Sequence, residues 1–264
     1  MSYVSQSVDH PLFEDILWSK PETKALAGKL LIIGGNSYSI AVPSQIYSHI
    51  CHYGAGEAKV VLPSTTRSYF AHTAPSPSIV FANSTPSGSF SHAALPVVLQ
   101  YSHWAEYIVI AGDMTKNSET TTFTAEFLSE SPLPVTIAGD SIDALQLYAE
   151  TLLARPDTVL CVNFMQLQKF ATLNRYHTAL TSSLSNNRFA SWLEEFSASI
   201  HTLLICTHAH TVYVASQGTV IATRPYTTTP TSMNHLVAAG SVWAMQHPTR
   251  RAEAIATAIT QIKL

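Results

Sequence analysis

Short apolar runs that end at glycine or proline recur along the chain and predict buried strands. The first run, residues 30–33, stops at Gly34-Gly35, and the second, residues 59–63, ends at a proline. Between them lies a segment of helical length, residues 43–53, with Pro43 suited to a first turn and Gly54 to a stop. A strand–helix–strand unit of this length fits a parallel crossover.

The same alternation continues as far as residue 173 and predicts one doubly wound, mostly parallel α/β sheet. The predicted strands are residues 78–81, 107–110, 134–137 and 158–162. The predicted helices are residues 91–104, 118–128, 141–154 and 165–173.

The last third of the chain is richer in β-branched residues. Runs at 203–206, 211–215 and 219–222 predict three strands, and Ser216-Gln217-Gly218 predicts a hairpin between the last two. We therefore expect an antiparallel hairpin beside the parallel sheet, followed by helices at 232–245 and 250–262. No linker or repeat interrupts residues 1–264, which predicts a single domain with residues 1–17 as an N-terminal extension.

The charge of the chain argues against several classes of partner. Charged residues make up 12% of the sequence and the formal net charge is −3, so we expect no nucleic-acid partner. No stretch reaches the roughly 20 apolar residues of a membrane span, and the first residues lack a signal-peptide pattern. The three cysteines lack the spacing of a metal or redox site, which predicts no metal and a reducing, cytoplasmic location.

Several motifs resemble one known family. In order along the chain they are Gly34-Gly35-Asn36, Ala41-Val42-Pro43, Gly54-Ala55-Gly56, the strand and glycine at 107–113, and the strand end at 134–145. Their order and spacing resemble those of the ADP-dependent NAD(P)H-hydrate dehydratases, which belong to the ribokinase-like superfamily. The resemblance implies a three-layer αβα sandwich, mostly parallel with a C-terminal antiparallel hairpin, and ADP or ATP as a bound nucleotide.

The resemblance also places candidate site residues. The substrate pocket would be formed by Gly34, Gly35, Asn36, Val42, Asp113 and Asn163. The adenine nucleotide would lie against Thr207, His208, Ala209, His210, Thr211 and Met233. Asn234 stands where the family has its catalytic aspartate.

This chain departs from the family pattern at several of these positions. The family has alanine, glycine and histidine at Val42, Asp113 and Asn163, and a lysine at Thr207. The family's Gly-Ser-Gly-Asp becomes Thr231-Ser232-Met233-Asn234.

Two of these departures change the expected chemistry. An asparagine cannot accept a proton as a general base, and Met233 would crowd a phosphate that approaches the backbone. Arg224 is the only charged residue between Glu195 and Arg250. The sequence therefore predicts impaired or lost nucleotide binding and catalysis.

Two further groups of residues could form a site. His208 and His210 would point to one face if both lay on a strand and could present two imidazoles to Zn²⁺, although an inherited structural role is simpler. Asp140 and Asp143 follow a predicted strand, where open α/β sheets bind ligands. The alternative is that Asp140 caps the following helix and Asp143 occupies its first turn.

Three functions remain open at this stage. The first is a divergent, dehydratase-like protein that binds a ligand or has a structural role, in effect a pseudoenzyme. The second is an active lyase of nicotinamide nucleotide repair in which Asp113 or Asp140 handles the proton. The third is a small-molecule kinase, which would need a catalytic base near Asn234. Because the family forms symmetric assemblies, we also expect a homo-oligomer.

Overall fold

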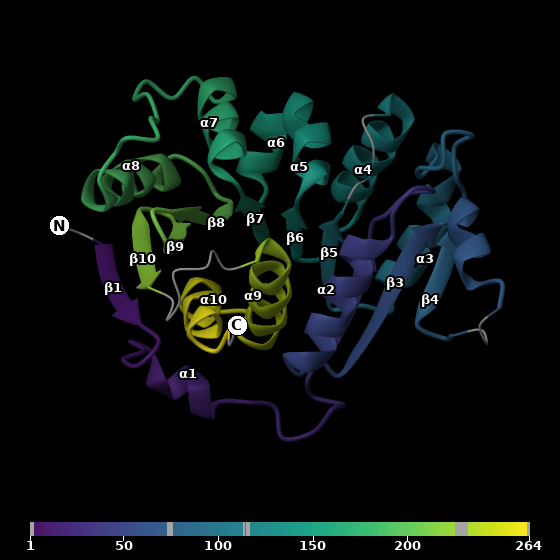
Figure 1. Cartoon of the computed structure of the whole chain (residues 1–264), viewed down its shortest axis with the longest axis horizontal. Coiled ribbons are helices and arrows are strands. Elements are labelled where there is room, and N and C mark those ends of the chain that lie inside the picture. The colour runs from purple at the N-terminus through teal and green to yellow at the C-terminus, as the bar shows by residue number, and fades with distance from the viewer. Residues whose placement is uncertain (1–2, 73–75, 113, 115–116, 225–231, 263–264) are drawn as a thin grey trace.

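A ten-stranded, mostly parallel sheet forms the centre of the molecule (Figure 1). The computed structural model describes residues 3–72, 76–112, 114, 117–224 and 232–262. The strands lie in the order β1-β10-β9-β8-β7-β6-β5-β2-β3-β4. Their bounds are β1 Tyr3–Ser7, β2 Lys29–Ile33, β3 Glu57–Pro63, β4 Ile79–Ala82, β5 Tyr107–Ala111, β6 Val135–Ala138, β7 Thr158–Val162, β8 Leu203–His208, β9 Thr211–Ser216 and β10 Thr219–Arg224.

Along the sheet, every pair of neighbouring strands from β4 through β3, β2, β5, β6 and β7 to β8 is parallel. The strand direction changes at β9. β9 runs antiparallel to both β8 and β10, which confirms the predicted hairpin. β1 then adds to β10 in a parallel register, with Tyr3 opposite Val220. The carboxyl ends of β2, β5, β6, β7 and β8 consequently meet along one edge of the sheet.

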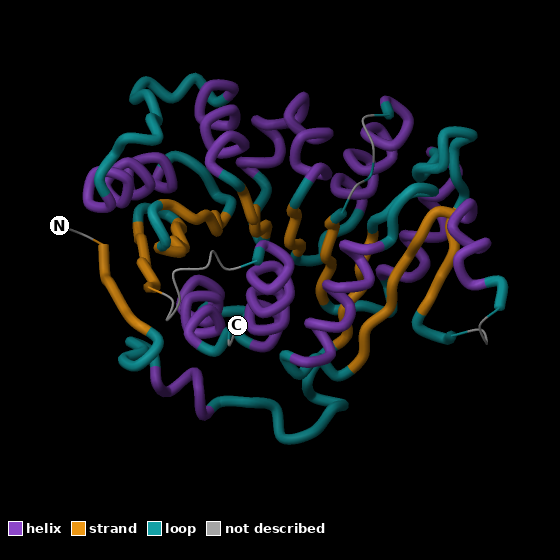
Figure 2. The backbone as a smooth tube through the Cα atoms, in the orientation of Figure 1, coloured by secondary structure: helices purple, strands orange, loops and turns teal. Residues whose placement is uncertain are grey.

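Helices cover both faces of this sheet (Figure 2). One face carries α1 Glu14–Trp18, α2 Ala41–His52, α9 Met233–Gln246 and α10 Arg251–Thr260. The other carries α3 Leu95–Ser102, α4 Ser118–Glu130, α5 Asp140–Ala144, α6 Ala149–Ala154, α7 Phe164–Leu173 and α8 Asn186–Ala198. Each layer buries its own apolar core, so the three-layer αβα prediction is confirmed. None of the helices in the described ranges combines the length and apolarity needed to cross a bilayer.

Several features of the fold were not predicted. The segment Tyr3–Ser7 is a strand, although only Gln6 in it is buried and no apolar run marks it. Helix α8 was missed even though its buried residues recur at helical spacing. The predicted helix at 141–154 is divided into α5, a 3₁₀ turn at Leu145–Tyr148, and α6.

Candidate functional site

Three glycine turns meet at the carboxyl ends of β2, β5 and β6. A Cβ added to Gly112 would lie 3.4 Å from the backbone nitrogen of Gly35 and 3.6 Å from the Cβ of Val42. A Cβ added to Gly139 would lie 3.7 Å from the nitrogen of Gly112. We call Gly35, Gly112 and Gly139 the glycine floor; all three have positive φ angles, of 84°, 112° and 67°. A side chain on any of them would strain the backbone.

Gly34 is needed for a different reason. A Cβ there would lie 1.8 Å from the carbonyl oxygen of Ala111, so only glycine lets β2 and β5 approach so closely at their ends. Gly34 therefore closes the end of β2 against β5, next to Gly35, while Val42 adjoins Gly112.

Asn36 stabilises the loop through its side chain. Its side chain is fully buried, and its Oδ1 accepts hydrogen bonds from the backbone N–H groups of Tyr38, at 2.7 Å, and Ser39, at 3.1 Å. This Asx-type turn holds the glycine loop in shape. Tyr38, which is 80% exposed, projects from the same turn and was not among the predicted residues.

Asn163 also has a structural bond. Its Oδ1 accepts a hydrogen bond from the backbone N–H of Gln166 at 2.9 Å. The backbone N–H of Asn163 in turn donates to the Oε1 of Gln166 at 3.1 Å, and the two bonds form a capping box at the start of α7. The Nε2 of Gln166 also donates to the carbonyl of Gly139 at 3.0 Å. Asn163 therefore supports the glycine floor through Gln166.

The two acidic residues after β6 differ in their surroundings. Asp143 accepts from Gln146 at 2.6 Å and from Gln166 at 3.3 Å, and it pairs with Lys169 at 3.7 Å. Asp140 is exposed and is the first residue of α5, while Gly139 is the N-cap, so the expectation that Asp140 caps this helix was wrong. Asp113 lies outside the described residues.

The turn between β8 and β9 does not place two histidines on one strand face. β8 ends at His208, and Ala209 and His210 form the turn with φ angles of 44° and 60°. Thr207 is the penultimate residue of β8, and Thr211 begins β9. The condition for two imidazoles on one strand face is therefore not met, and the described residues contain no group of three or more potential metal ligands.

His208 is packed between aromatic rings. Its ring stacks on Phe189 at 4.4 Å between centroids and lies 6.1 Å from Phe164. Its Nε2 lies 2.8 Å from the carbonyl oxygen of Leu184. These contacts fix the ring and use one of its two nitrogens.

The first turn of α9 is held by contacts to α2 and β7. Asn234 donates from Nδ2 to the Oε1 of Gln45 at 2.7 Å. The sulfur of Met233 lies 3.1 Å from the Sγ of Cys161, so this side chain packs against the core instead of filling the space ahead of the helix.

A histidine–tyrosine cluster between α2 and α9 was missed by sequence reasoning. His49 and His235 lie 3.8 Å apart between ring centroids, and the Tyr53 hydroxyl lies 2.8 Å from the Nδ1 of His235. Burial lowers the pKa of both histidines, and the charge of nearby His52 lowers it further. The spacing of Gln45, His49 and Tyr53 on one helix face could have indicated this cluster.

Comparison with known proteins shows similarity in structure but not in sequence. No protein-family model and no curated protein sequence matches the chain. A ribokinase-like superfamily protein from Enterococcus faecalis superposes with a TM-score of 0.69 at 15% identity, covering 96% of this chain and 84% of that one. This chain has the ribokinase-like fold.

Other ribokinase-like structures give the same result at lower similarity. The Bacillus subtilis ADP/ATP-dependent NAD(P)H-hydrate dehydratase, co-crystallised with ATP and Mg²⁺, has a TM-score of 0.60 at 12% identity, over 94% of this chain and 86% of that one. Phosphomethylpyrimidine kinase from Clostridium difficile has a TM-score of 0.51 at 10% identity, over 88% and 96%. At these identities the fold is shared, while the chemistry must be argued from the site itself.

Proposed function

We propose that this protein is a divergent, dehydratase-like member of the ribokinase-like proteins that keeps a ligand pocket at the glycine floor without the nucleotide-dependent reaction. The proximity of Gly35, Gly112 and Gly139, with Val42 beside Gly112, supports this proposal. The family's lysine, glycine and aspartate, which would bind a nucleotide and accept a proton, are replaced by Thr207, Met233 and Asn234.

The observation that carries the proposal is the hydrogen bond between Asn234 and Gln45. An aspartate at this position would be a proton acceptor at the start of a helix. The Asn234 amide donates to Gln45 on α2, and an amide does not accept a proton near neutral pH. The position is thus occupied by a structural tie between two helices.

The residues around α9 do not fit a bound ADP or ATP. Met233 stands where the family pattern has a glycine, and a residue with a Cβ leaves the backbone less freedom to approach an oxyanion than glycine does. The family's strand-end lysine is replaced by Thr207, and Arg224 is the only charged residue in the sequence between Glu195 and Arg250. Residues 196–249 therefore offer little positive charge to bind phosphate groups.

A turnover assay tests this proposal. Hydrated NADH is incubated with ATP and Mg²⁺, or with ADP and Mg²⁺, and the near-ultraviolet absorbance of NADH is followed. We expect no recovery with the wild-type protein and none with Asp140→Asn, while the Bacillus subtilis enzyme serves as the positive control. Recovery by the wild-type protein would contradict the proposal.

One alternative has an observation of its own. Asp140 is an exposed carboxylate that directly follows Gly139 at the glycine floor, so it could serve as the proton acceptor in an active lyase. In the same assay this alternative requires wild-type recovery that Asp140→Asn abolishes and that Glu150→Gln, a change at an exposed residue of α6, leaves intact.

A further inference from the structure

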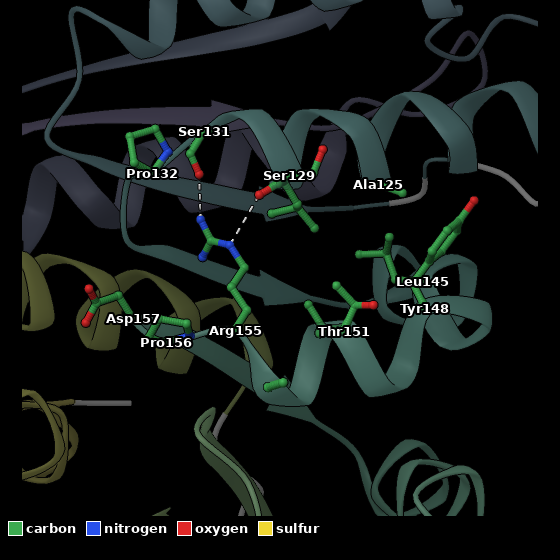
Figure 3. A pocket seen from close by; sticks show the side chains of 13 residues that line it. Ala125, Ser129, Ser131, Pro132, Leu145, Tyr148, Thr151, Arg155, Pro156 and Asp157 are labelled. Carbon is green, nitrogen blue, oxygen red and sulfur yellow. Dashed lines mark hydrogen bonds between the residues drawn. The ribbon is translucent and has the colours of Figure 1, made fainter.

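A concave space lies at the amino-terminal ends of the strands, at the opposite edge of the sheet from the glycine floor. Its volume is about 600 Å³, and it opens between α4 on one side and the 3₁₀ turn and α6 on the other (Figure 3). Its lining includes Ser131 and Pro132, just before β6, and residues 155–157, just before β7. We call this space the pocket between α4 and α6.

The walls of this pocket are mainly apolar. Leu128 of α4, Leu145 of the 3₁₀ turn and Leu152 of α6 line it and are at least nine-tenths buried. The ring of Tyr148 stands at one end, 40% exposed, as Figure 3 shows. Sites for small organic molecules are typically spaces of roughly 300–1,000 Å³ that are lined by such side chains. Both the size and the lining are therefore those of a small-molecule site.

Arg155 brings a positive charge to the lining, but its hydrogen bonds are made within the chain. Its Nε donates to the carbonyl of Leu128 at 3.3 Å, and its Nη1 donates to the hydroxyl of Thr158 at 2.8 Å. Its Nη2 donates to the carbonyls of Ser131, at 2.8 Å, and Leu133, at 2.9 Å. These bonds occupy four of the five N–H groups of the guanidinium. The Leu128 carbonyl lies in the last turn of α4, where the negative end of the helix dipole also balances the charge.

Three other polar side chains of the lining offer little to a ligand. The carboxylate of Asp157 pairs with Arg251 of α10. The hydroxyl of Ser129 donates to the carbonyl of Glu126 at 2.9 Å. The hydroxyl of Ser131 has less than 1 Å² of accessible surface, so a molecule in the pocket does not reach it.

Charges of both signs therefore stand at this pocket, and each has a partner within the chain. An anionic ligand would face the Asp157 carboxylate, and a cationic one would face the Arg155 guanidinium. A charged ligand would lose its hydration without gaining an unpaired counter-charge, which costs free energy. The hydroxyls of Tyr148 and Thr151 belong to exposed residues, where water can bond to them. This lining favours a ligand without charge, whose affinity comes from apolar surface.

We propose that the pocket between α4 and α6 binds an uncharged, mainly apolar small molecule. Burial of its apolar surface against Leu128, Leu145 and Leu152 supplies the affinity. The paired charges of Arg155 and Asp157 select against anions and cations of the same shape. The pocket lies on other elements than the glycine floor and α9, so binding here does not depend on the function proposed for them.

Competition among naphthalene compounds tests the proposed ligand class. The fluorescence of N-phenyl-1-naphthylamine, an uncharged apolar probe, is followed as the full-length protein is titrated. We expect saturable binding of one probe per chain, with a dissociation constant in the micromolar range. The competitors are 1-naphthalenemethanol, 1-naphthoate and 1-naphthylmethylammonium, which share one ring system and differ in charge. The uncharged alcohol should displace the probe at a concentration at least about fivefold below that of either ion. Absence of saturable probe binding, or equal displacement by an ion, would overturn the proposal.

Variants then locate the binding. Thr151→Phe, at an exposed position of α6, fills the pocket and should abolish probe binding. Thr172→Phe makes the same exchange at an exposed position of α7 outside the lining and should leave binding unchanged. Ala125→Phe fills the pocket from α4 and gives the same test should Thr151→Phe not fold. Unchanged probe binding in a folded pocket-filling variant would show that the probe binds elsewhere and would refute the site.

Light scattering tests whether a second copy of the chain covers the pocket instead. We expect the wild-type protein and Thr151→Phe to have the same mass in solution. A wild-type oligomer that Thr151→Phe converts to a smaller species would identify a second copy as the occupant and would overturn the proposal.

Discussion

The Nδ2 of Asn234 lies 2.7 Å from the Oε1 of Gln45, which ties the first turn of α9 to α2 across 189 positions of the chain. The contact places an amide pair at the position where the NAD(P)H-hydrate dehydratase pattern, which this sequence resembles, has an aspartate. It also sets the orientation of the Asn234 side chain, since its nitrogen must face α2.

This tie should contribute measurably to stability. Asn234→Ala and Gln45→Ala should each lower the free energy of unfolding by about 0.5 kcal/mol, because the hydrogen bond is neutral and partly exposed. The double variant should lose less than the sum of the two, which a double-mutant cycle in urea would measure. Full additivity would show that the two side chains do not interact in solution.

The glycine floor should tolerate no side chain. Gly112→Ala should lower the free energy of unfolding by about 1–3 kcal/mol, since its φ is 112° and the new Cβ would lie 3.1 Å from the Cδ of Pro43. Gly54→Ala is the matched control, because its φ is 93° and a Cβ there would contact nothing within 4 Å. Chemical denaturation should show the larger loss for Gly112→Ala, and equal losses would contradict the packing described here.

The histidine–tyrosine cluster should make the protein less stable in mild acid. The pKa values of His49 and His235 are lowered in the folded state, so below about pH 6.5 the unfolded chain binds protons that the folded chain resists. The stability is therefore complete above that pH and is lost as the pH falls. Urea midpoints should drop between about pH 7.5 and pH 5.5.

His235→Gln should reduce this drop, because it removes one of the two stacked imidazoles. His103→Gln, at an exposed position after α3, is the control and should keep the wild-type pH dependence. An identical drop in the wild-type protein and His235→Gln would show that the cluster does not cause it.

Much of the sheet could be predicted because its strands are continuous apolar runs. Residues 30–33 and 158–162 are buried on both faces, which leaves a clear pattern in the sequence. β1 carries no such pattern, since Tyr3–Ser7 lies at the sheet edge and is fixed by long-range bonds of Gln6 to Thr223 and to the Ala256 carbonyl. Pairing of this kind cannot be found in a local window.

The glycine turns of the candidate site could be predicted from the sequence, but the hydrogen bonds that its polar side chains make could not. Glycines after strands mark close approach, and Gly34, Gly35 and Gly112 do lie together. The roles of Asn36 and Asn163 depend on which neighbouring N–H groups their side chains reach: Asn36 stabilises a turn, and Asn163 caps a helix. The pocket between α4 and α6 has no motif in the sequence, because its lining comes from helix ends that only the fold brings together.

The homo-oligomer expected from the sequence remains a prediction. Light scattering should give a multiple of 28.7 kDa, and a monomer mass would refute the prediction.

The most direct test of the central claim is calorimetric titration of the wild-type protein with ADP and with ATP, each with Mg²⁺, and with NADPH. The loss of the strand-end lysine, the glycine and the aspartate predicts no binding of any of the three in the micromolar range. Micromolar affinity for one of them would show that the nucleotide site has survived these substitutions and would contradict this account.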